Sequence, residues 1–198
     1  MAMLPELVDE GRKVLVFSQF TSMLALIEHE LDKMGIAYVT LTGDTVDREV
    51  PIRRFPDADV PVIPLSIQSR GGPEEAYKLG RALAPLTGKG FLVIASGNVT
   101  HNLRDYQAAA RNGGRTPSYV REFSDWVANR LAENDVPALL DYRRQARGGI
   151  EAHPTDEHLL PLYVALVAGG ENPKANRFHA GIDDYVIAMD AFSFLAKK

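Results

Sequence analysis

The sequence predicts an α/β fold, a three-layer sandwich in which a mostly parallel central sheet is flanked by helices. Short apolar runs at Lys13–Phe17 and Phe91–Ala95 have the length and composition of strands that are buried on both faces. Amphipathic helical patterns alternate with these runs along the chain, as parallel sheets require. The chain has 198 residues, of which 45% are hydrophobic, enough for one well-buried core. We therefore expect a single α/β domain over residues 1–198.

The first part of the chain predicts a βαβ unit. After the strand at Lys13–Phe17, apolar residues recur at helical spacing until Gly35, whose conformational freedom suits a helix end. These apolar residues are Phe20, Leu24, Ile27, Leu31 and Met34. A second strand is expected at Ala37–Leu41, followed by a short helix over Asp44–Phe55 that Pro51 interrupts or delays.

The elements after residue 56 follow from proline, glycine and apolar spacing. The run Asp57–Ser66 contains Pro61 and Pro64, so its strand must start late, bulge or lie at a sheet edge. Pro73 marks the first turn of a helix that ends by Gly88. Residues 102–116 are expected to form a loop. Helices are then expected from Ser118, over residues 135–145, and up to Gly169, with Trp126 in the core.

Composition and net charge indicate which classes of ligand and partner the protein does not bind. The formal charge of -4 and the pI near 5.7 indicate no basic surface for a phosphate backbone, so we do not expect nucleic acid as a partner. No glycine-rich loop of the Gly-Lys-Thr/Ser type occurs, so we do not expect ATP as a ligand. The chain has no cysteine, no apolar run of membrane-spanning length and no secretory pattern at its start. We expect a cytoplasmic protein that does not bind membranes.

One segment carries a specific motif set. Residues 11–24 read GRKVLVFSQFTSML, and LTGDT follows at 41–45 and RRF at 53–55. This segment, residues 11–55, resembles the second motor lobe of Swi/Snf-type helicases. The resemblance implies that Ser18, Gln19 and Thr21 contact the backbone of a DNA strand, and a simpler interpretation of these residues is a capped strand-to-helix turn.

A different family is indicated by residues 57–194. The motifs SGNVTHNL at 96–103, HPTDEHLLPL at 153–162 and YVIAMDAFSF at 185–194 resemble those of extradiol ring-cleavage dioxygenases of the DOPA dioxygenase, or LigB, class. That resemblance implies a divalent metal, Fe(II) or Zn, that opens a catechol ring. It implies that His158 is a metal ligand and that His101 acts on the substrate as acid or base. Asn102 and His153 are candidates for substrate contact.

The dioxygenase resemblance is incomplete at its N-terminal side. The family's other two metal histidines lie in a part that helicase-like sequence replaces here, and His29 lies on the polar side of a predicted helix. His153 and His158 are five residues apart, the wrong spacing for one helix face.

Three functional interpretations therefore stay open. The first is a chimeric, even artificial, protein without a complete active site. The second is a residual metal-dependent dioxygenase, and the third is a helicase fragment that binds nucleic acid. A dimer is expected, because a spliced fragment would otherwise expose an apolar sheet edge.

Overall fold

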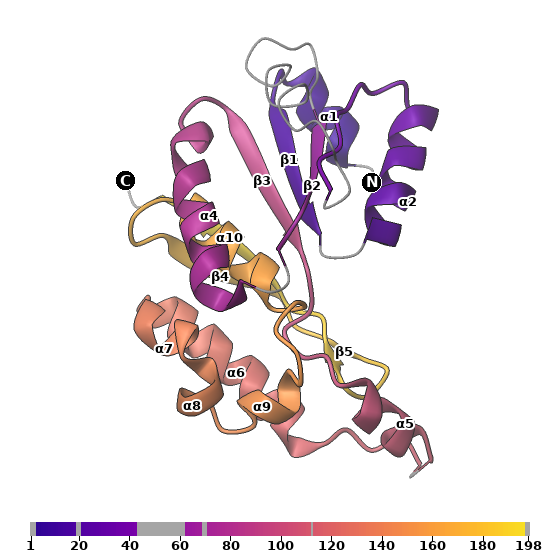
Figure 1. Ribbon diagram of the computed structural model, residues 1–198, viewed down its shortest axis with the longest axis vertical. Coiled ribbons are helices and arrows are strands. Elements are labelled where there is room, and N and C mark those ends of the chain that lie inside the picture. The colour runs from indigo at the N-terminus through magenta and orange to yellow at the C-terminus, as the bar shows by residue number, and fades with distance from the viewer. Residues whose placement is uncertain (1–2, 19–20, 43–61, 69–70, 112, 197–198) are drawn as a thin grey trace.

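The computed structural model describes residues 3–18, 21–42, 62–68, 71–111 and 113–196 (Figure 1). Its centre is a parallel sheet of three strands in the order β2-β1-β3. These strands are β1 (Lys13–Ser18), β2 (Val62–Ser66) and β3 (Phe91–Ser96). The predicted strands at Lys13–Phe17 and Phe91–Ala95 are confirmed, and the described part of the run that contains Pro64 forms β2, at one edge of the described sheet.

Helices cover both faces of this sheet. On one face lie α1 (Met3–Asp9) and α2 (Thr21–Lys33), and on the other lie α4 (Gly72–Thr87) and α10 (Leu160–Ala168) (Figure 1). The strand period of two divides β1 between the layers, because Val14 and Val16 pack with Leu31 of α2 while Leu15 and Phe17 join the larger core. The α/β fold class predicted from the sequence is therefore confirmed.

The strand predicted at Ala37–Leu41 is wrong. The segment has isolated bridge residues at Tyr38 and Leu41 in place of a continuous strand. Leu41 bridges Leu65 of β2 in parallel, and the amide of Ser66 donates to the Leu41 carbonyl at 2.9 Å. Pro64 lies two residues before Ser66 and has no N–H to donate. A continued ladder on this side of β2 therefore lacks a donor. The helix predicted over Asp44–Phe55 lies outside the described residues.

A second group of elements follows β3. The loop predicted over residues 102–116 is wrong for most of its length, because α5 spans Leu103–Arg111. Asn102 starts this helix, since its side-chain Oδ1 accepts hydrogen bonds from the amides of Arg104 (3.1 Å) and Asp105 (3.3 Å). An N-terminal cap of this kind is a local sequence signal, and the prediction of a loop did not take it into account.

The remaining elements form a helical group and two small antiparallel sheets. The helices are α6 (Ser118–Glu133), α7 (Val136–Leu140), α8 (Tyr142–Gln145) and α9 (Gly149–Ala152). Strand β4 (Lys174–His179) pairs with β7 (Ala191–Leu195), and β5 (Ile182–Asp183) pairs with β6 (Ile187–Ala188). The main core continues from the sheet through α10 into α6, and Trp126 packs against it partly buried.

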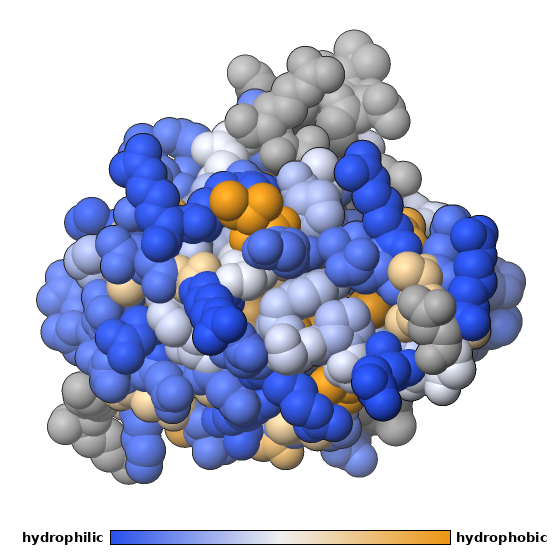
Figure 2. Space-filling view, turned by 90° about the horizontal axis from the view of Figure 1, so that it is seen from below, coloured by the Kyte–Doolittle hydropathy of each residue, from blue (hydrophilic) through white to orange (hydrophobic). Residues whose placement is uncertain are grey.

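The surface is mainly polar on the face seen from below the view of Figure 1. Figure 2 shows hydrophilic side chains across most of this face, with hydrophobic residues in small separate patches. Within the described part of the chain, no helix has both the length and the apolar composition needed to cross a membrane.

Candidate functional site

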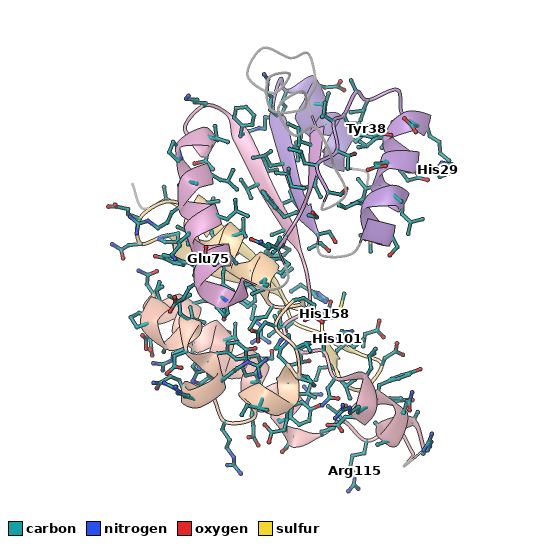
Figure 3. All side chains as sticks on the ribbon, viewed as in Figure 1. His29, Tyr38, Glu75, His101, Arg115 and His158 are labelled. Atoms are coloured by element: carbon teal, nitrogen blue, oxygen red, sulfur yellow. The ribbon has the colours of Figure 1, made fainter. Side chains whose placement is uncertain are left out.

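Two histidines from distant motifs meet beyond the carboxyl end of β3 (Figure 3). His101 lies in the loop that follows β3, and His158 lies in the turn that precedes α10. Their rings stack with centroids 3.3 Å apart and an interplanar angle of 15°. The fold thus brings together the two residues for which the dioxygenase resemblance implies catalytic and metal-binding roles. Ligand sites of parallel α/β sheets lie at this end of the strands.

Glycine allows the two loops to approach. A Cβ atom on Gly97 would lie 2.3 Å from the His158 carbonyl oxygen and 2.9 Å from Cγ of Pro161, so a larger residue would force the loops apart. The next residue, Asn98, donates its amide to the same His158 carbonyl at 2.9 Å. These contacts hold the end of β3 directly against the turn that carries His158.

The loop after β3 is also tied to the C-terminal strands. Thr100 is fully buried, and its hydroxyl donates to the Val186 carbonyl and accepts from the amide of Ala188, both at 2.7 Å. The amide of His101 donates to the Ala152 carbonyl at 2.8 Å. The loop around His101 is therefore fixed by two separate parts of the chain, residues 186–188 and the end of α9.

Both stacked histidines are neutral at pH 7. Burial, reinforced by the neighbouring His101, lowers the pKa of His158 to about 4, and burial also lowers the pKa of His101. Oε1 of Glu157 lies 3.8 Å from His158 Nε2. Because the imidazole is uncharged at neutral pH, this contact is not an ion pair there. Neutral imidazole is the form that binds metals or accepts protons.

His153, a candidate for substrate contact, lies near the stacked pair and is not part of the stack. Its side chain is fully buried, and Nε2 donates to the Val99 carbonyl at 2.7 Å, which leaves Nδ1 as an acceptor without a partner among the described residues. Phe123 and Tyr142 pack edge-on against its ring. Through its hydrogen bond to Val99, His153 supports the loop that follows β3.

Asn102, the other candidate for substrate contact, is also engaged in structure. Its amide Nδ2 donates to the Glu151 carbonyl at 2.8 Å while its Oδ1 caps α5, and 8% of the residue is exposed. Its hydrogen bonds thus link the start of α5 to α9.

The described residues do not fit a three-ligand metal centre. Imidazole ligands bind through in-plane lone pairs, and these two rings have centroids 3.3 Å apart and planes inclined by only 15°, so the two planes meet far beyond the ~2.1 Å length of a metal–nitrogen bond. Within the described ranges, no group of three histidine, aspartate or glutamate side chains is placed to hold a metal ion. His29 and His179 are exposed at other places.

The strand ends next to this site carry hydroxyl groups. Ser18 of β1 lies opposite Ser66 of β2 and Ser96 of β3 in the sheet register, so three serines form a row at the carboxyl edge. Sequence analysis did not identify this row, although each serine directly follows an apolar run. Ser18 is fully buried, so its side chain is not open to a nucleic-acid phosphate. Gln19 and the side chain of Thr21 lie outside the described residues.

An apolar cavity of about 930 Å³ opens beside His158. Its walls come from β3, α10 and β7, with Phe192 and Phe194 among the lining side chains. This volume lies within the usual range for small-molecule sites, and its lining suits an aromatic ring.

Comparison with known proteins supports two resemblances. The family model "Catalytic LigB subunit of aromatic ring-opening dioxygenase" matches residues 27–188. The 4,5-DOPA dioxygenase extradiol of Beta vulgaris is 36% identical over 140 residues, which are 71% of this chain and 51% of that protein. The chain thus spans about half the length of the curated relatives that it matches. The family match begins before residue 57, where the dioxygenase-like segment was predicted to start.

The helicase-like resemblance is also found. A SWI/SNF-related regulator of chromatin from Caenorhabditis elegans, of subfamily A containing DEAD/H box 1, is 49% identical over 55 residues, 27% of this chain and 6% of that protein.

Among solved structures, an uncharacterized protein from Escherichia coli K12, JW3007, superposes with a TM-score of 0.64 and 25% sequence identity. This match covers 93% of the chain and 86% of that protein, so it extends into the segment before residue 57. The chain therefore belongs to the family of the catalytic LigB subunit of aromatic ring-opening dioxygenases.

Proposed function

We propose that this chain is a LigB-type protein that retains part of a ring-cleavage site but does not complete the metal centre, and that it does not cleave catechol rings by itself. One observation carries the proposal. The His101 and His158 rings are stacked nearly parallel, and within the described residues no group of three possible ligands is placed to hold a metal ion. Imidazoles in this arrangement offer a metal ion one ligand at a time, which is insufficient for a defined catalytic centre.

The retained part is suited to an aromatic ligand. The apolar cavity beside His158 offers aliphatic and aromatic walls, and the neutral His101 is able to accept a proton from a phenolic hydroxyl. Binding of a catechol without its cleavage is the activity that we expect from these residues.

We also propose that the chain joins a helicase-like segment at residues 11–55 to the dioxygenase-like remainder. The 49% identity to a chromatin remodeller over 55 residues supports this origin. Both segments are α/β units with a parallel strand followed by a helix, so one can replace the other while the hydrophobic strand register is kept. Nucleic acid and ATP are not proposed as ligands, because the net charge is -4 and Ser18 is buried.

The alternative is a residual extradiol dioxygenase that binds Zn or Fe(II) through His158. The observation that favours it is the short distance, 3.8 Å, between the carboxylate of Glu157 and Nε2 of His158. If the stacked rings separate, two imidazoles and one carboxylate would form the ligand set that non-haem iron oxygenases use.

Anaerobic titration calorimetry with Fe(II) and with Zn(II) distinguishes the two functions. The metal-stripped protein is compared with His158→Ala and His101→Ala, and with His29→Ala as a control at an exposed histidine. We expect no stoichiometric binding in the micromolar range and no difference among the four proteins. One-to-one micromolar binding that both site variants lose and His29→Ala keeps would overturn the proposal.

Oxygen consumption with a catechol substrate provides an independent readout. We expect no uptake above that of free Fe(II) when the protein is mixed with Fe(II) and the catechol. Uptake that depends on both His101 and His158 would establish the alternative instead.

A further inference from the structure

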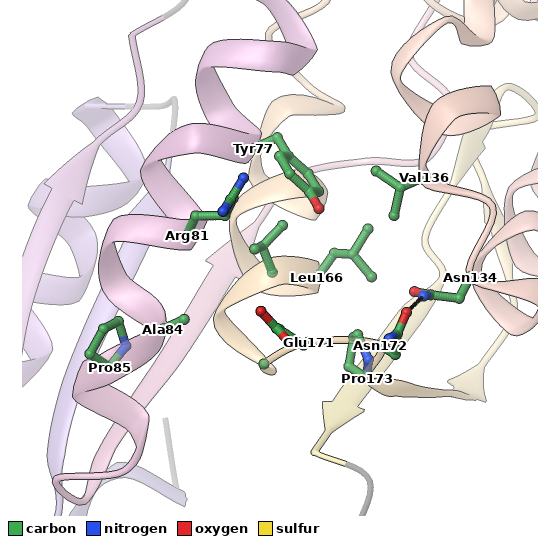
Figure 4. A pocket seen from close by; sticks show the side chains of 12 residues that line it. Tyr77, Arg81, Ala84, Pro85, Asn134, Val136, Leu166, Glu171, Asn172 and Pro173 are labelled. Carbon is green, nitrogen blue, oxygen red and sulfur yellow. Dashed lines mark hydrogen bonds between the residues drawn. The ribbon is translucent and has the colours of Figure 1, made fainter.

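A second cavity, of about 510 Å³, lies between α4, the end of α10 and the turn after α6 (Figure 4). It shares no lining residue with the apolar cavity beside His158. Neither of the resemblances implies a role for it. Its volume is sufficient for a small molecule.

One basic and one acidic side chain line this cavity and form no ion pair with each other. Arg81 projects from α4 and Glu171 follows α10, and both are exposed. Neither side chain forms a hydrogen bond or an ion pair with another described residue. A cavity with one unpaired cation and one unpaired anion is complementary to a ligand that carries both charges.

The space between these charges has an apolar floor. Leu166, which is 1% exposed, and Val136 lie at the base of the cavity. The ring of Tyr77 forms part of one wall, with its hydroxyl directed into the space (Figure 4). A ligand therefore meets charged groups at the rim and hydrocarbon beneath.

A pair of asparagines gives a second, independent indication. Asn134 and Asn172 both have left-handed backbones, with φ of 56° and 52°, and the Asn134 amide donates to Oδ1 of Asn172 across one side of the cavity (Figure 4). The Oδ1 atom of Asn134 is buried and has no hydrogen-bond partner among the described residues. An unpaired buried acceptor of this kind is stabilised by an incoming donor such as an ammonium group.

We infer that this cavity binds a small zwitterion, an α-amino acid with an apolar side chain. Its carboxylate pairs with the Arg81 guanidinium, and its ammonium group donates to Glu171 and to Oδ1 of Asn134. The side chain covers Leu166 and Val136. The carboxylate and the ammonium group of the ligand each contact cavity groups that have no other partner among the described residues. The ligand's side chain covers the apolar surface at the base of the cavity.

The test uses L-leucine as the probe and follows binding by NMR on the full ¹⁵N-labelled chain. Two analogues each remove one charge: isoamylamine lacks the carboxylate, and 4-methylpentanoate lacks the ammonium group. We expect saturable shifts at Tyr77, Arg81 and Asn134, with leucine bound at least about tenfold more tightly than either analogue, because a charged hydrogen-bonded pair contributes that much.

Variants then locate the site. Arg81→Gln and Glu171→Gln are each expected to weaken leucine binding by about tenfold or more. Arg121→Gln and Glu74→Gln change exposed charges elsewhere and should bind as the unmodified chain does. An absence of saturable binding, equal binding of either analogue, or unchanged binding by either site variant would each overturn the proposal. The comparison of the analogues needs no variant, so the test stands even if one variant fails to fold.

Discussion

At the scale of single residues, His153 shows how this fold uses a titratable group as a core residue. Its ring is enclosed by Phe123 and Tyr142, and its one hydrogen bond fixes Val99 in the loop that carries His101. Burial is the main reason that its pKa falls from 6.5 to about 4, and the nearby His158 and His101 lower it further, whereas the hydrogen bond to Val99 and the nearby Asp156 raise it. Protonation of His153 is therefore less favourable in the folded protein than in the unfolded chain.

The free energy of unfolding should consequently depend on pH through His153. Above pH 6.5 the imidazole is neutral in both states, and below it the unfolded chain takes up the proton first, so stability falls as the pH drops from 6.5 towards 4. We expect His153 to account for a loss of about 2–4 kcal/mol over this window. Urea unfolding between neutral pH and pH 4 measures it, and His153→Gln should flatten the curve.

His29→Gln is the matched control for that experiment, since His29 is exposed on α2. Its curve should follow that of the unmodified chain. Parallel curves for His153→Gln and the unmodified chain would show that the proton uptake occurs elsewhere, for example at His158 or His101.

At the scale of elements, the crossing of α4 and α10 determines how the sheet is covered. Helix α10 is apolar on nearly every side, and seven of its nine residues are buried. Gly80 of α4 is the point of closest approach, because a Cβ atom there would lie 2.6 Å from the Val164 carbonyl oxygen and 3.0 Å from its Cα. Both of those atoms belong to the backbone, so relief requires the helices to move apart.

Gly80→Ala should therefore destabilise the protein, although alanine is the better helix former. Helix propensity alone favours alanine by about 1 kcal/mol, whereas overpacking at a backbone contact costs about 1–3 kcal/mol or more. We expect a net loss of at least about 1 kcal/mol in chemical unfolding.

Gly88→Ala is the control, since its nearest contact would be an ordinary 3.7 Å, and its φ of -66° suits any residue. Its effect should stay within about 0.5 kcal/mol. A stabilised Gly80→Ala protein would mean that the two helices are not in close contact in solution.

At the scale of the whole molecule, the outer edge of β3 has no neighbouring strand within the described chain. Within the described chain β3 pairs only with β1, and its six residues are only partly buried although five of them are apolar. Phe178, Met189 and Leu195 line the cavity beside this edge and are 65%, 44% and 63% exposed. Exposed apolar edges of this kind favour association.

Dimer formation stays a prediction, and this surface is where we expect it. Light scattering after gel filtration should give a dimer at micromolar concentration for the unmodified chain. Phe178→Ser combined with Leu195→Ser should shift it to the monomer, because both changes remove apolar area from the rim.

The control for the dimer combines Leu26→Ser with Ile150→Ser, at positions that are 62% and 59% exposed but do not line this cavity. Its mass should equal that of the unmodified chain. A monomer for the unmodified chain, or equal masses for the rim and control variants, would exclude this surface as the interface.

Much of the architecture follows from local sequence patterns. The apolar runs and helical spacings predicted β1, α2, β3, α4 and α6, because each pattern depends on residues within one or two turns of each other. The failures also have local explanations: the absent N–H of Pro64 deprives the expected strand at 37–41 of a donor, and the cap from Asn102 forms a helix where glycine and proline favoured a loop.

By itself the sequence determined the alternation of strands and helices, the two family resemblances, and which histidines belong to a ring-cleavage motif. Only the tertiary structure decided that the His101 and His158 rings stack face to face, and that Arg81 and Glu171 line one cavity without pairing. Ring orientation and cavity lining depend on contacts between segments that are far apart in the chain, and no periodicity along one segment encodes them.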